Sequence, residues 1–586
     1  MTISDFSRDA VCQYLRSVVF IDDKLFSTPH FRVENETLVV DGQPEFVVNG
    51  GTASSDNDSA ELEISGGDAQ NGGVLRFNDK SQEDAQAITD GFAKEGIICG
   101  IYKPMFFPET GFENEEGFTT LLKVCKNADV FILDWQLFKE NDNAVMQLLT
   151  HILTEDKSSS APNPVRFCAI YTNSIVDTVC DKIFTALRRI VPETKRQGLK
   201  LSSGGLTVSV YARDVNSPDP IAAEDLAGKI ISDFAKTYEG ILPALALRGI
   251  ASIRNNVKRI LDRFPADMDP ALVLHAGLTI RGMCVSQDVS TLVGDEVAAL
   301  LDDEKEADET IYDLCGKYIE GCNDSVFDKT GDEELDKAFL TRSTSSEVKQ
   351  YIQKVFEQRT FFPKDVDGQF KPVFKDCKES KSFTPKRRLT QLLGKLVARK
   401  SNQTGTYKFG ALTALFCCRT NYAESKILRF GTVVKELLPE GRNGHYYICL
   451  MPLCDSIRLT DHVTKEDGST EAINYRFPFW QLTEVSDDIQ GRNHGLVLKG
   501  EDGEFHPYCA TGKIRDNFSH FEFNSQDSIV PFDVNGAVKT VGATHTFEWV
   551  AELKSAHIQR MAEFVSREFS RVGLTESEWL RLQVDR

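Results

Sequence analysis

The sequence predicts an α/β fold whose N-terminal part is a doubly wound parallel sheet. Short apolar runs alternate there with amphipathic segments of helical length. The runs are apolar at almost every position, which is typical of strands buried on both faces. Three of the runs end at acidic or hydroxyl residues: 17–21 precedes Asp22 and Asp23, 130–133 precedes Asp134, and 165–171 precedes Thr172. In open α/β sheets chemical sites lie beyond the carboxyl ends of the strands, so these residues are expected to share one pocket.

The strands and helices of this part alternate regularly. Strands are expected at 17–21, 97–102, 130–133, 165–171 and 206–212, and helices at 5–15, 83–94, 115–127, 144–153 and 176–190. Connections of this kind join parallel strands through right-handed βαβ units, and five such strands fit a flavodoxin-like domain. Residues 26–80 interrupt the alternation. Their alternating runs and their Gly-, Asn- and Ser-rich stretch predict an inserted β-hairpin with a flexible tip.

The rest of the chain is first helical and then β-rich. Apolar residues recur at three- and four-residue steps between Ile250 and Phe264, which predicts a helix with one apolar face. Further helices are expected at 345–357, 390–398 and 552–569, and strands at 433–438, 446–451, 496–499 and 546–549. We therefore expect three parts: an α/β domain over 1–215 with the insertion 26–80, a helical linker or dimerisation region over 216–335, and an α+β domain of unknown function over 336–586.

Composition argues against several functional classes. The formal net charge of -21 argues against broad attraction to nucleic acid or to an anionic membrane. No apolar stretch is long enough to span a bilayer, and residues 1–20 do not have the pattern of a signal peptide. The 14 cysteines form no regular framework, which is typical of reduced thiols and a cytoplasmic location.

The residues at the strand ends are suited to phosphoryl transfer. A carboxylate can accept a phosphoryl group as a covalent intermediate, and Mg²⁺ offsets the charge of the phosphoryl oxygens. Because Mg²⁺ prefers oxygen ligands, we expect it to be held by the carboxylates of Asp22, Asp23 and Asp134 and by the carbonyl oxygen of Gln136. Asp134 would also be the nucleophile. The hydroxyl of Thr172 would hydrogen-bond the phosphoryl oxygen and couple phosphorylation to a shift of its loop.

Residues 17–23, 130–137 and 165–174 resemble the receiver domain of two-component response regulators. The resemblance implies that Asp22 and Asp23 are the acidic metal-binding pair, Asp134 the phosphoacceptor and Thr172 the switch hydroxyl. It also implies a lysine followed by proline after the fifth strand, where this sequence has Arg213 without a following proline. Arginine keeps the charge but has a forked head in place of an ammonium, so it can impair phosphoryl transfer. The insertion 26–80 lies beside the acidic pair and could cover the pocket.

The resemblance extends to long receiver-like proteins of bacterial anti-phage phosphorelays such as Detocs. It is carried by segments 242–256, 447–456, 570–573 and 578–581. It implies a sensor histidine kinase as partner, and a role either beside a second, effector-bearing regulator or as a phosphate buffer without an effector. Self-association through helices in 221–264 is a further possibility, although packing inside one subunit explains the apolar stripe equally well.

Two other functions stay open. An effector enzyme with a hydrolytic or nucleotide-processing site in the C-terminal part would use Cys454 and Asp455 with His445 or His462, or a metal cluster of His506, Cys509, His494 and His520. A buried structural cysteine is the simpler interpretation of Cys454. A nucleic-acid-binding regulator would use the basic stripe 386–400, which more simply pairs with acidic segments. The aromatic run 477–480 is interpreted as core.

Overall fold

The computed structural model describes most of the chain. The described residues are 1–22, 80–104, 116–137, 143–158, 165–213, 217, 219–278, 283–306, 308–327, 344–360, 407–421, 426–438, 444–456, 459–460, 462–465, 469–485, 495–511, 514–526 and 529–571. The chain divides into two compact units: an N-terminal unit, Ser4–Arg248, and a C-terminal unit, Gly249–Arg586 with Met1–Ile3. The predicted insertion hairpin and the predicted helix at 390–398 lie outside the described residues. The division into three parts stays a prediction.

The N-terminal unit is built on a sheet that contains the five predicted strands. They are β1 (Ser17–Ile21), β2 (Ile98–Tyr102), β3 (Val130–Asp134), β4 (Arg166–Thr172) and β7 (Leu206–Ala212). Their order across the sheet is β2-β1-β3-β4-β7, and every pair along it is parallel. When only the parallel strands are counted, β7 is the fifth, and the order is 2-1-3-4-5. This is the strand order of a flavodoxin-like doubly wound sheet. The predicted α/β class and architecture are therefore confirmed.

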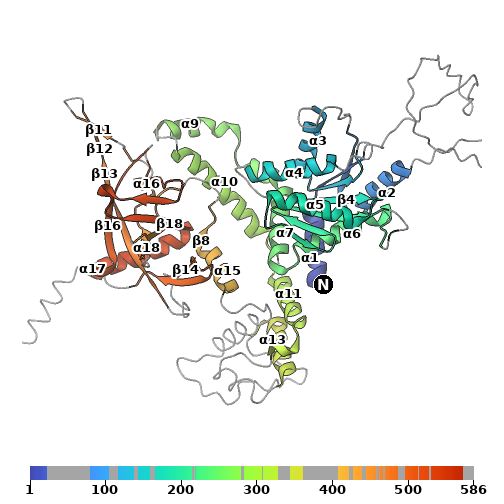
Figure 1. Ribbon diagram of the computed structural model, residues 1–586. Helices are drawn as coiled ribbons and strands as arrows, with labels where there is room; N and C mark the ends of the chain where they lie inside the picture. Colours follow the sequence, from blue (N-terminus) through green and yellow to red (C-terminus); the bar gives the residue numbers. More distant parts are fainter. Residues whose placement is uncertain are drawn as a thin grey trace, which may run out of the picture. The chain divides into compact units, whose positions relative to one another are not determined.

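Helices cover both faces of this sheet, as Figure 1 shows. The helices are α1 (Ile3–Tyr14), α2 (Lys80–Lys94), α3 (Glu116–Asn127), α4 (Asn143–Ser158), α5 (Val176–Ile190) and α6 (Ala223–Thr237). Side chains of α3, α4 and α5 form one core with alternate strand residues such as Phe131, Leu133 and Cys168. Successive strand residues point to opposite faces. The neighbouring Phe167 accordingly meets Phe234 of α6, with ring centroids 5.7 Å apart.

Helices α2 and α6 pack closely on that second face. A Cβ added at Gly91 of α2 would lie 3.0 Å from the Cβ of Ala227 in α6. The absence of a side chain at Gly91 therefore permits this close approach. Phe234 of α6 also contacts Tyr14 of α1, at 6.2 Å between centroids. Helix α6, which sequence analysis placed in the helical region, thus packs within the N-terminal unit.

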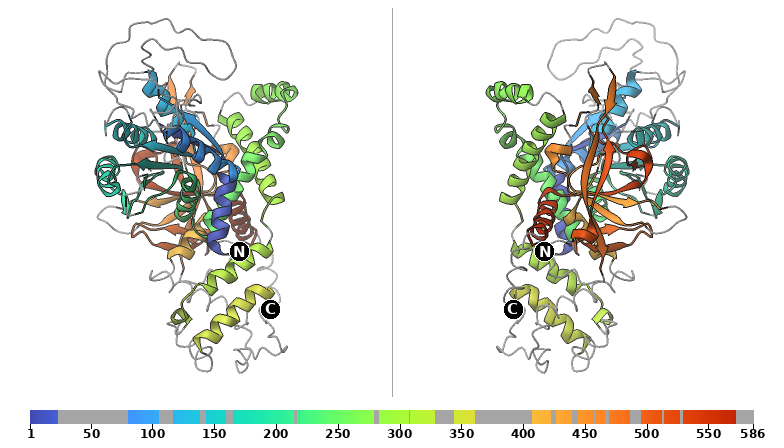
Figure 2. Two further views of the ribbon diagram at one scale, coloured as in Figure 1. Left: turned by 90° about the vertical axis from the view of Figure 1, so that its right-hand side faces the viewer. Right: turned by 90° about the vertical axis from the view of Figure 1, so that its left-hand side faces the viewer.

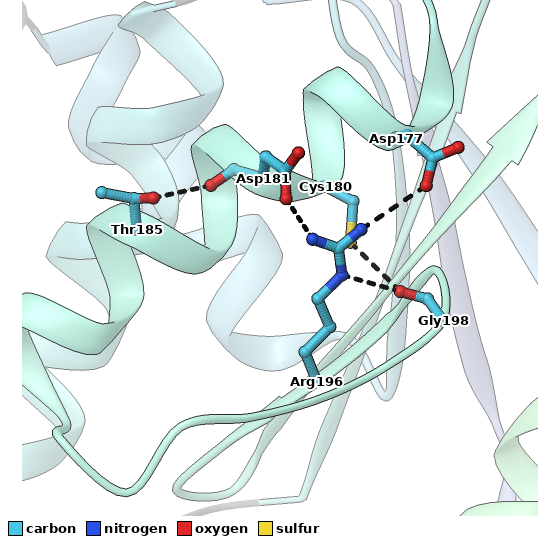
Figure 3. A network of polar contacts seen from close by, with 6 residues as sticks. All are labelled: Asp177, Cys180, Asp181, Thr185, Arg196 and Gly198. Atoms are coloured by element: carbon cyan, nitrogen blue, oxygen red, sulfur yellow. Dashed lines mark hydrogen bonds and ion pairs between the residues drawn. The ribbon is translucent and has the colours of Figure 1, made fainter.

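The sheet is extended at one edge by a hairpin that sequence analysis did not predict. Strands β5 (Lys195–Gln197) and β6 (Lys200–Ser203) pair antiparallel, and β6 adds antiparallel to β7. Gly198 at the tip has φ of 61°, a conformation that glycine adopts without steric cost. Figure 3 shows how Arg196 joins the hairpin to α5: its guanidinium pairs with Asp181 and lies 3.5 Å from Asp177. Its Nε also donates to the carbonyl oxygen of Gly198 at 2.9 Å.

The region that follows is helical, as predicted. Its helices are α7 (Ile241–Asn255), α8 (Val257–Leu261), α9 (Asp269–Leu278), α10 (Met283–Asp303), α11 (Asp308–Glu320) and α13 (Ser345–Gln358). The apolar stripe 250–264 does not lie on one helix, because the chain leaves helical geometry at Asn256, with φ of -109° and ψ of 15°. Glu304 fixes this break. It accepts hydrogen bonds from the Ser252 hydroxyl at 2.6 Å and the Asn256 amide at 2.8 Å, and it pairs with Arg259.

None of the described helices combines the length and the apolar character that crossing a membrane requires.

The C-terminal unit contains a nine-stranded sheet, whose orange and red strands are seen in the right-hand view of Figure 2. They are β8 (Cys418–Arg419), β9 (Thr432–Glu436), β10 (Tyr446–Cys449), β13 (Asn474–Glu484), β14 (Gly495–Lys499), β15 (Phe505–Cys509), β16 (Phe518–Asn524), β17 (Ala537–Lys539) and β18 (Thr546–Leu553). The order is β14-β15-β13-β10-β9-β18-β17, with β16 on β13 and β8 on β18, and all pairs are antiparallel. Strands β11 (His462–Thr464) and β12 (Thr470–Ala472) form a separate pair. Helices α15 (Tyr407–Cys417), α16 (Leu453–Ser456), α17 (Ile514–Asn517) and α18 (Ser555–Arg571) complete the described α-helices and strands.

This sheet has a core on each face. Helix α18 buries Ile558, Met561 and Val565 in one core, together with Trp480 of β13. The second core contains Phe477 and Phe479 of the same strand among other aromatic residues. Phe477, Phe479 and Trp480 are all fully buried. The interpretation of 477–480 as core is confirmed, and the β-rich C-terminal class is confirmed with it.

His557 joins α18 to the sheet and makes the unit sensitive to acid. Its Nε2 contacts the carbonyl oxygen of Gly495 at 3.0 Å, and Arg560 contacts its Nδ1 at 3.0 Å. Both contacts are hydrogen bonds in the neutral Nε2–H tautomer. Burial, together with the charge of Arg560, lowers the pKa of His557. The folded state therefore resists protonation, and stability falls as the pH drops below the unfolded pKa of about 6.5.

We expect the His557→Gln variant to lose this part of the acid sensitivity, because glutamine stays neutral. The measurement is the melting temperature of the C-terminal transition between pH 8 and pH 5. The variant His520→Gln, at an exposed histidine of the same unit, is the matched control. If the melting temperature of His557→Gln fell with decreasing pH as steeply as that of the wild type, His557 would not be a source of the acid sensitivity.

Candidate functional site

The strand register brings the predicted residues to one edge of the N-terminal sheet. Ile21 of β1 is paired with Leu133 of β3, so the residues that follow them, Asp22 and Asp134, are neighbours. Asp134 is in turn paired with Tyr171 of β4. Adjacent strands lie about 4.8 Å apart, so carboxylates at neighbouring strand ends come close together.

Asp134 closes β3 and is nearly buried, with 7% of its surface exposed. The backbone N–H of Gln136 donates to its Oδ1 at 3.2 Å, which orients the carboxylate over the turn. Trp135 and Leu137, on either side of Gln136, are each 1% exposed and belong to the core below. Their burial anchors the turn, so the structure holds the carboxylate and the backbone of Gln136 next to one another.

Asp22 follows β1 directly and is fully buried. A charged carboxylate is costly to bury unless a cation or hydrogen-bond donors accompany it. Its Oδ2 lies 3.8 Å from Nη1 of Arg213. Asp23, the second residue of the predicted acidic pair, lies outside the described residues.

Thr172 ends β4 and is 1% exposed. Its Oγ1 accepts a hydrogen bond from the N–H of Ser174 at 3.0 Å, and its carbonyl oxygen accepts one from the N–H of Arg213 at 2.8 Å. The second bond joins the ends of β4 and β7. Helix α5 begins shortly afterwards at Val176. Because the Thr172 hydroxyl is hydrogen-bonded to Ser174, a displacement of this hydroxyl would also shift the residues that lead into α5.

Arg213 brings a buried positive charge to the site, since only 8% of its side chain is exposed. Its Nε donates to Oδ2 of Asp84 at 2.7 Å, and its Nη2 pairs with the same oxygen. Its guanidinium lies 5.5 Å from the ring centroid of Tyr171. Burial alone would lower the pKa of Arg213, but Asp84 first and then the charges of Asp22 and Asp134 raise it. The guanidinium is therefore held charged next to the two strand-end carboxylates.

Sequence reasoning missed Asp84 and Tyr171. Asp84 lies near the start of α2 and is separated from Arg213 by 129 residues, so no local pattern relates them. Tyr171 was counted as part of an apolar strand. Its hydroxyl donates to the carbonyl oxygen of Ile221 at 2.9 Å, and its ring packs beside the guanidinium. The only sign of Asp84 in the sequence was that an acidic residue stands near the start of the helix that follows the first strand.

The donor set suits a hard cation, although the structure describes only part of it. Two carboxylates at neighbouring strand ends and the nearby backbone of Gln136 are oxygen donors of the type that Mg²⁺ prefers. Within the described residues no group of three or more His, Cys, Asp or Glu side chains is arranged to hold a metal ion. Completion of the predicted set depends on Asp23, outside those residues.

The alternative C-terminal candidates do not gather into one site in the described part of the unit. His506 contacts Asp502 at 2.9 Å and Glu484 at 3.3 Å, whereas Cys509 on the same strand is fully buried. Residues three apart on a strand point to opposite faces, so these two cannot share a metal ion. His445 bonds the amide of Gln481 at 3.0 Å. Asp455 is exposed, and the side chains of Cys454 and His462 lie outside the described set, as do His494 and the stripe 386–400.

Comparison with known proteins agrees with the N-terminal architecture. Residues 14–218 match the family model of the response receiver domain. No curated protein and no solved structure matches this chain. The matched segment begins before β1 and ends after β7 and Arg213, so it spans the five parallel strands and their carboxyl edge. Residues 14–218 therefore form a divergent response-regulator receiver domain.

Proposed function

We propose that the receiver domain accepts a phosphoryl group on Asp134 from a histidine kinase. The observation that carries the proposal is the alignment of Asp22, Asp134, Thr172 and Arg213 at one edge of the sheet. Phosphoacceptor function of the response-regulator type follows from the family. The choice of Asp134 is ours. It rests on its position at the end of the central strand, between Asp22 and Thr172.

The reaction is a transfer between two covalent carriers. A carboxylate oxygen of Asp134 attacks phosphorus as the bond from phosphorus to the donor's imidazole nitrogen breaks, and the imidazole leaves with the electron pair. Asp22, Asp23, Asp134 and the Gln136 carbonyl would hold Mg²⁺, which when bound offsets charge on the phosphoryl oxygens. The Arg213 guanidinium supplies a second positive charge beside the acceptor. The oxygen of the Thr172 hydroxyl accepts from the N–H of Ser174, so its O–H can donate to a phosphoryl oxygen.

We further propose that the protein acts as a phosphate buffer, so that the uptake of phosphoryl groups is its function and no effector activity follows. Its support in the C-terminal unit is the separation of His506 and Cys509, which leaves that pair without a shared metal or nucleophilic role. The sensor kinase and the anti-phage setting are supported by the family resemblance of segments 242–256 and 447–456. A partner regulator, or self-association through 221–264, belongs to the same proposal.

The test uses the purified full chain, Mg²⁺ and a small acyl or amido phosphodonor. We expect the intact mass to rise by one phosphoryl group, and chelation of Mg²⁺ to prevent the rise. The same experiment with a purified, autophosphorylated sensor histidine kinase tests the proposed class of physiological donor. If neither donor transfers a phosphoryl group in the presence of Mg²⁺, the proposal is wrong.

A further inference from the structure

A guanidinium has two edges that can bind different partners. In Arg213, Nε and Nη2 form one edge, and both contact Oδ2 of Asp84. The remaining nitrogen, Nη1, lies on the side of Asp22, at 3.8 Å from its Oδ2. One carboxylate on α2 therefore occupies one edge of the arginine and leaves the other edge to the acidic pocket.

We propose that Asp84 is a positioning residue, which holds the guanidinium of Arg213 back from Asp22 so that the pocket can take Mg²⁺ and a phosphoryl group. The inference rests on the proposed function and deepens it. It also accounts for the arginine: an ammonium is a compact point charge, whereas a guanidinium can be anchored through one edge while the other faces the site.

Because these side chains are buried, the contact with Asp84 determines where the Arg213 guanidinium lies. The Arg213 side chain is 8% exposed, Asp84 is 16% exposed and Asp22 is fully buried. Coulombic attraction is strong in such surroundings, so a guanidinium released from Asp84 would move onto the nearest carboxylate. Among the described residues that carboxylate is Asp22, whose Oδ2 already lies 3.8 Å from Nη1 and which is a predicted ligand of Mg²⁺. Loss of Asp84 would then convert Arg213 from a neighbour of the metal site into its competitor.

A purely structural role for Asp84 makes a different prediction. In that case Asp84 would fasten α2 to the end of β7, and its loss would lower stability without a specific effect on the pocket. The two roles are separated by removing Arg213 first. A positioning residue loses its effect on the pocket when the group it positions is absent, whereas a helix anchor affects folding through other contacts as well.

The experiment compares the wild-type full chain with Asp84→Asn, Arg213→Ala and the double variant. It measures Mg²⁺ affinity by calorimetry and the initial rate of phosphorylation by a small phosphodonor. We expect Asp84→Asn to weaken Mg²⁺ binding and to slow phosphorylation by about tenfold each, the range of coupling between contacting groups. In the Arg213→Ala background Asp84→Asn should change neither quantity. Asp90→Asn, an exposed acid of the same helix, controls for lost charge.

The outcomes are distinct. An effect of Asp84→Asn that persists in the Arg213→Ala background, or no effect at all, would overturn the proposal. If Asp84→Asn does not fold, Asp84→Glu keeps the charge and should give an intermediate Mg²⁺ affinity. Equal affinity in Asp84→Glu and the wild type would then count against positioning. If Mg²⁺ binds but neither the small phosphodonor nor a histidine kinase phosphorylates the wild type or any variant, the proposed function fails while the affinities still decide the role of Asp84. A wild-type chain that binds no Mg²⁺ contradicts both.

Discussion

Replacement of Asp134 by asparagine is expected to abolish phosphoryl uptake. The amide has nearly the shape of the carboxylate and can still accept the hydrogen bond from Gln136, so the turn is kept. It is not a nucleophile for phosphorus and cannot form the acyl phosphate. The loss should be complete with either donor, whereas a positioning residue would give only a partial loss. The measurement is the intact mass after incubation with the phosphodonor and Mg²⁺.

The matched control is Asp177→Asn. Asp177 lies in the first turn of α5, beyond the end of β4, and 74% of its side chain is exposed. Its replacement removes the same charge from the same domain and should leave the extent of phosphorylation unchanged. Circular dichroism of both variants would establish that the fold is intact. Phosphoryl uptake by a folded Asp134→Asn variant at the wild-type level would exclude Asp134 as the acceptor.

Breaking the buried ion pair between Arg166 and Asp156 is expected to have the largest effect on stability. The two side chains are each 7% exposed and form a direct ion pair, and Nε of Arg166 also donates to the carbonyl oxygen of Lys126 at 3.3 Å. Burial raises the pKa of Asp156 although Arg166 opposes the rise. The variant Arg166→Met leaves a buried carboxylate without its counter-ion, at a cost of about 3–5 kcal/mol.

The measurement is urea denaturation of the full chain, followed through the transition of the N-terminal unit. The double variant Arg166→Met/Asp156→Leu removes both charges and should recover much of the lost stability, because no isolated charge is left buried. A single variant as stable as the wild type would show that the pair is not important for folding. A double variant less stable than the single one would contradict the electrostatic explanation.

The parallel sheet could be predicted because its strands carry their own signal. Strands β3, β4 and β7 are mostly apolar, and each is buried along its whole length. Helix α5 was predicted at its observed bounds, because its apolar residues recur with helical spacing and an acid stands in its first turn. Each of these signals lies within the segment itself, and the packing of the folded domain favours the same secondary structure.

The missed elements lack such signals. Strand β5 is polar at all three positions and exposed, so its conformation depends on pairing with β6 and on Arg196. Strand β13 contains Pro478, which cannot donate to a neighbouring strand; its carbonyl oxygen instead accepts from Leu450 at 2.8 Å. The break at Asn256 depends on Glu304, nearly fifty residues away. Contacts between distant segments decide all three.

Part of the candidate site could also be predicted from the sequence, and part could not. Asp22, Asp134 and Thr172 could be brought together from sequence because parallel strands align their carboxyl ends. The partner of Arg213 could not, because Asp84 reaches it only through the packing of α2 beside the sheet. The sequence therefore predicts which groups line the edge, and the three-dimensional structure is needed to show how the cation among them is held.

The aspartate that carries the phosphoryl group can be located directly by chemical trapping. Borohydride reduces an acyl phosphate to an alcohol, so a phosphorylated aspartate becomes homoserine, which tandem mass spectrometry locates in the sequence. We expect homoserine at position 134 in protein treated with phosphodonor and Mg²⁺, and none in the untreated protein. Homoserine at Asp22 or Asp23 in place of position 134, or at none of the three while the intact mass still rises, would contradict the account.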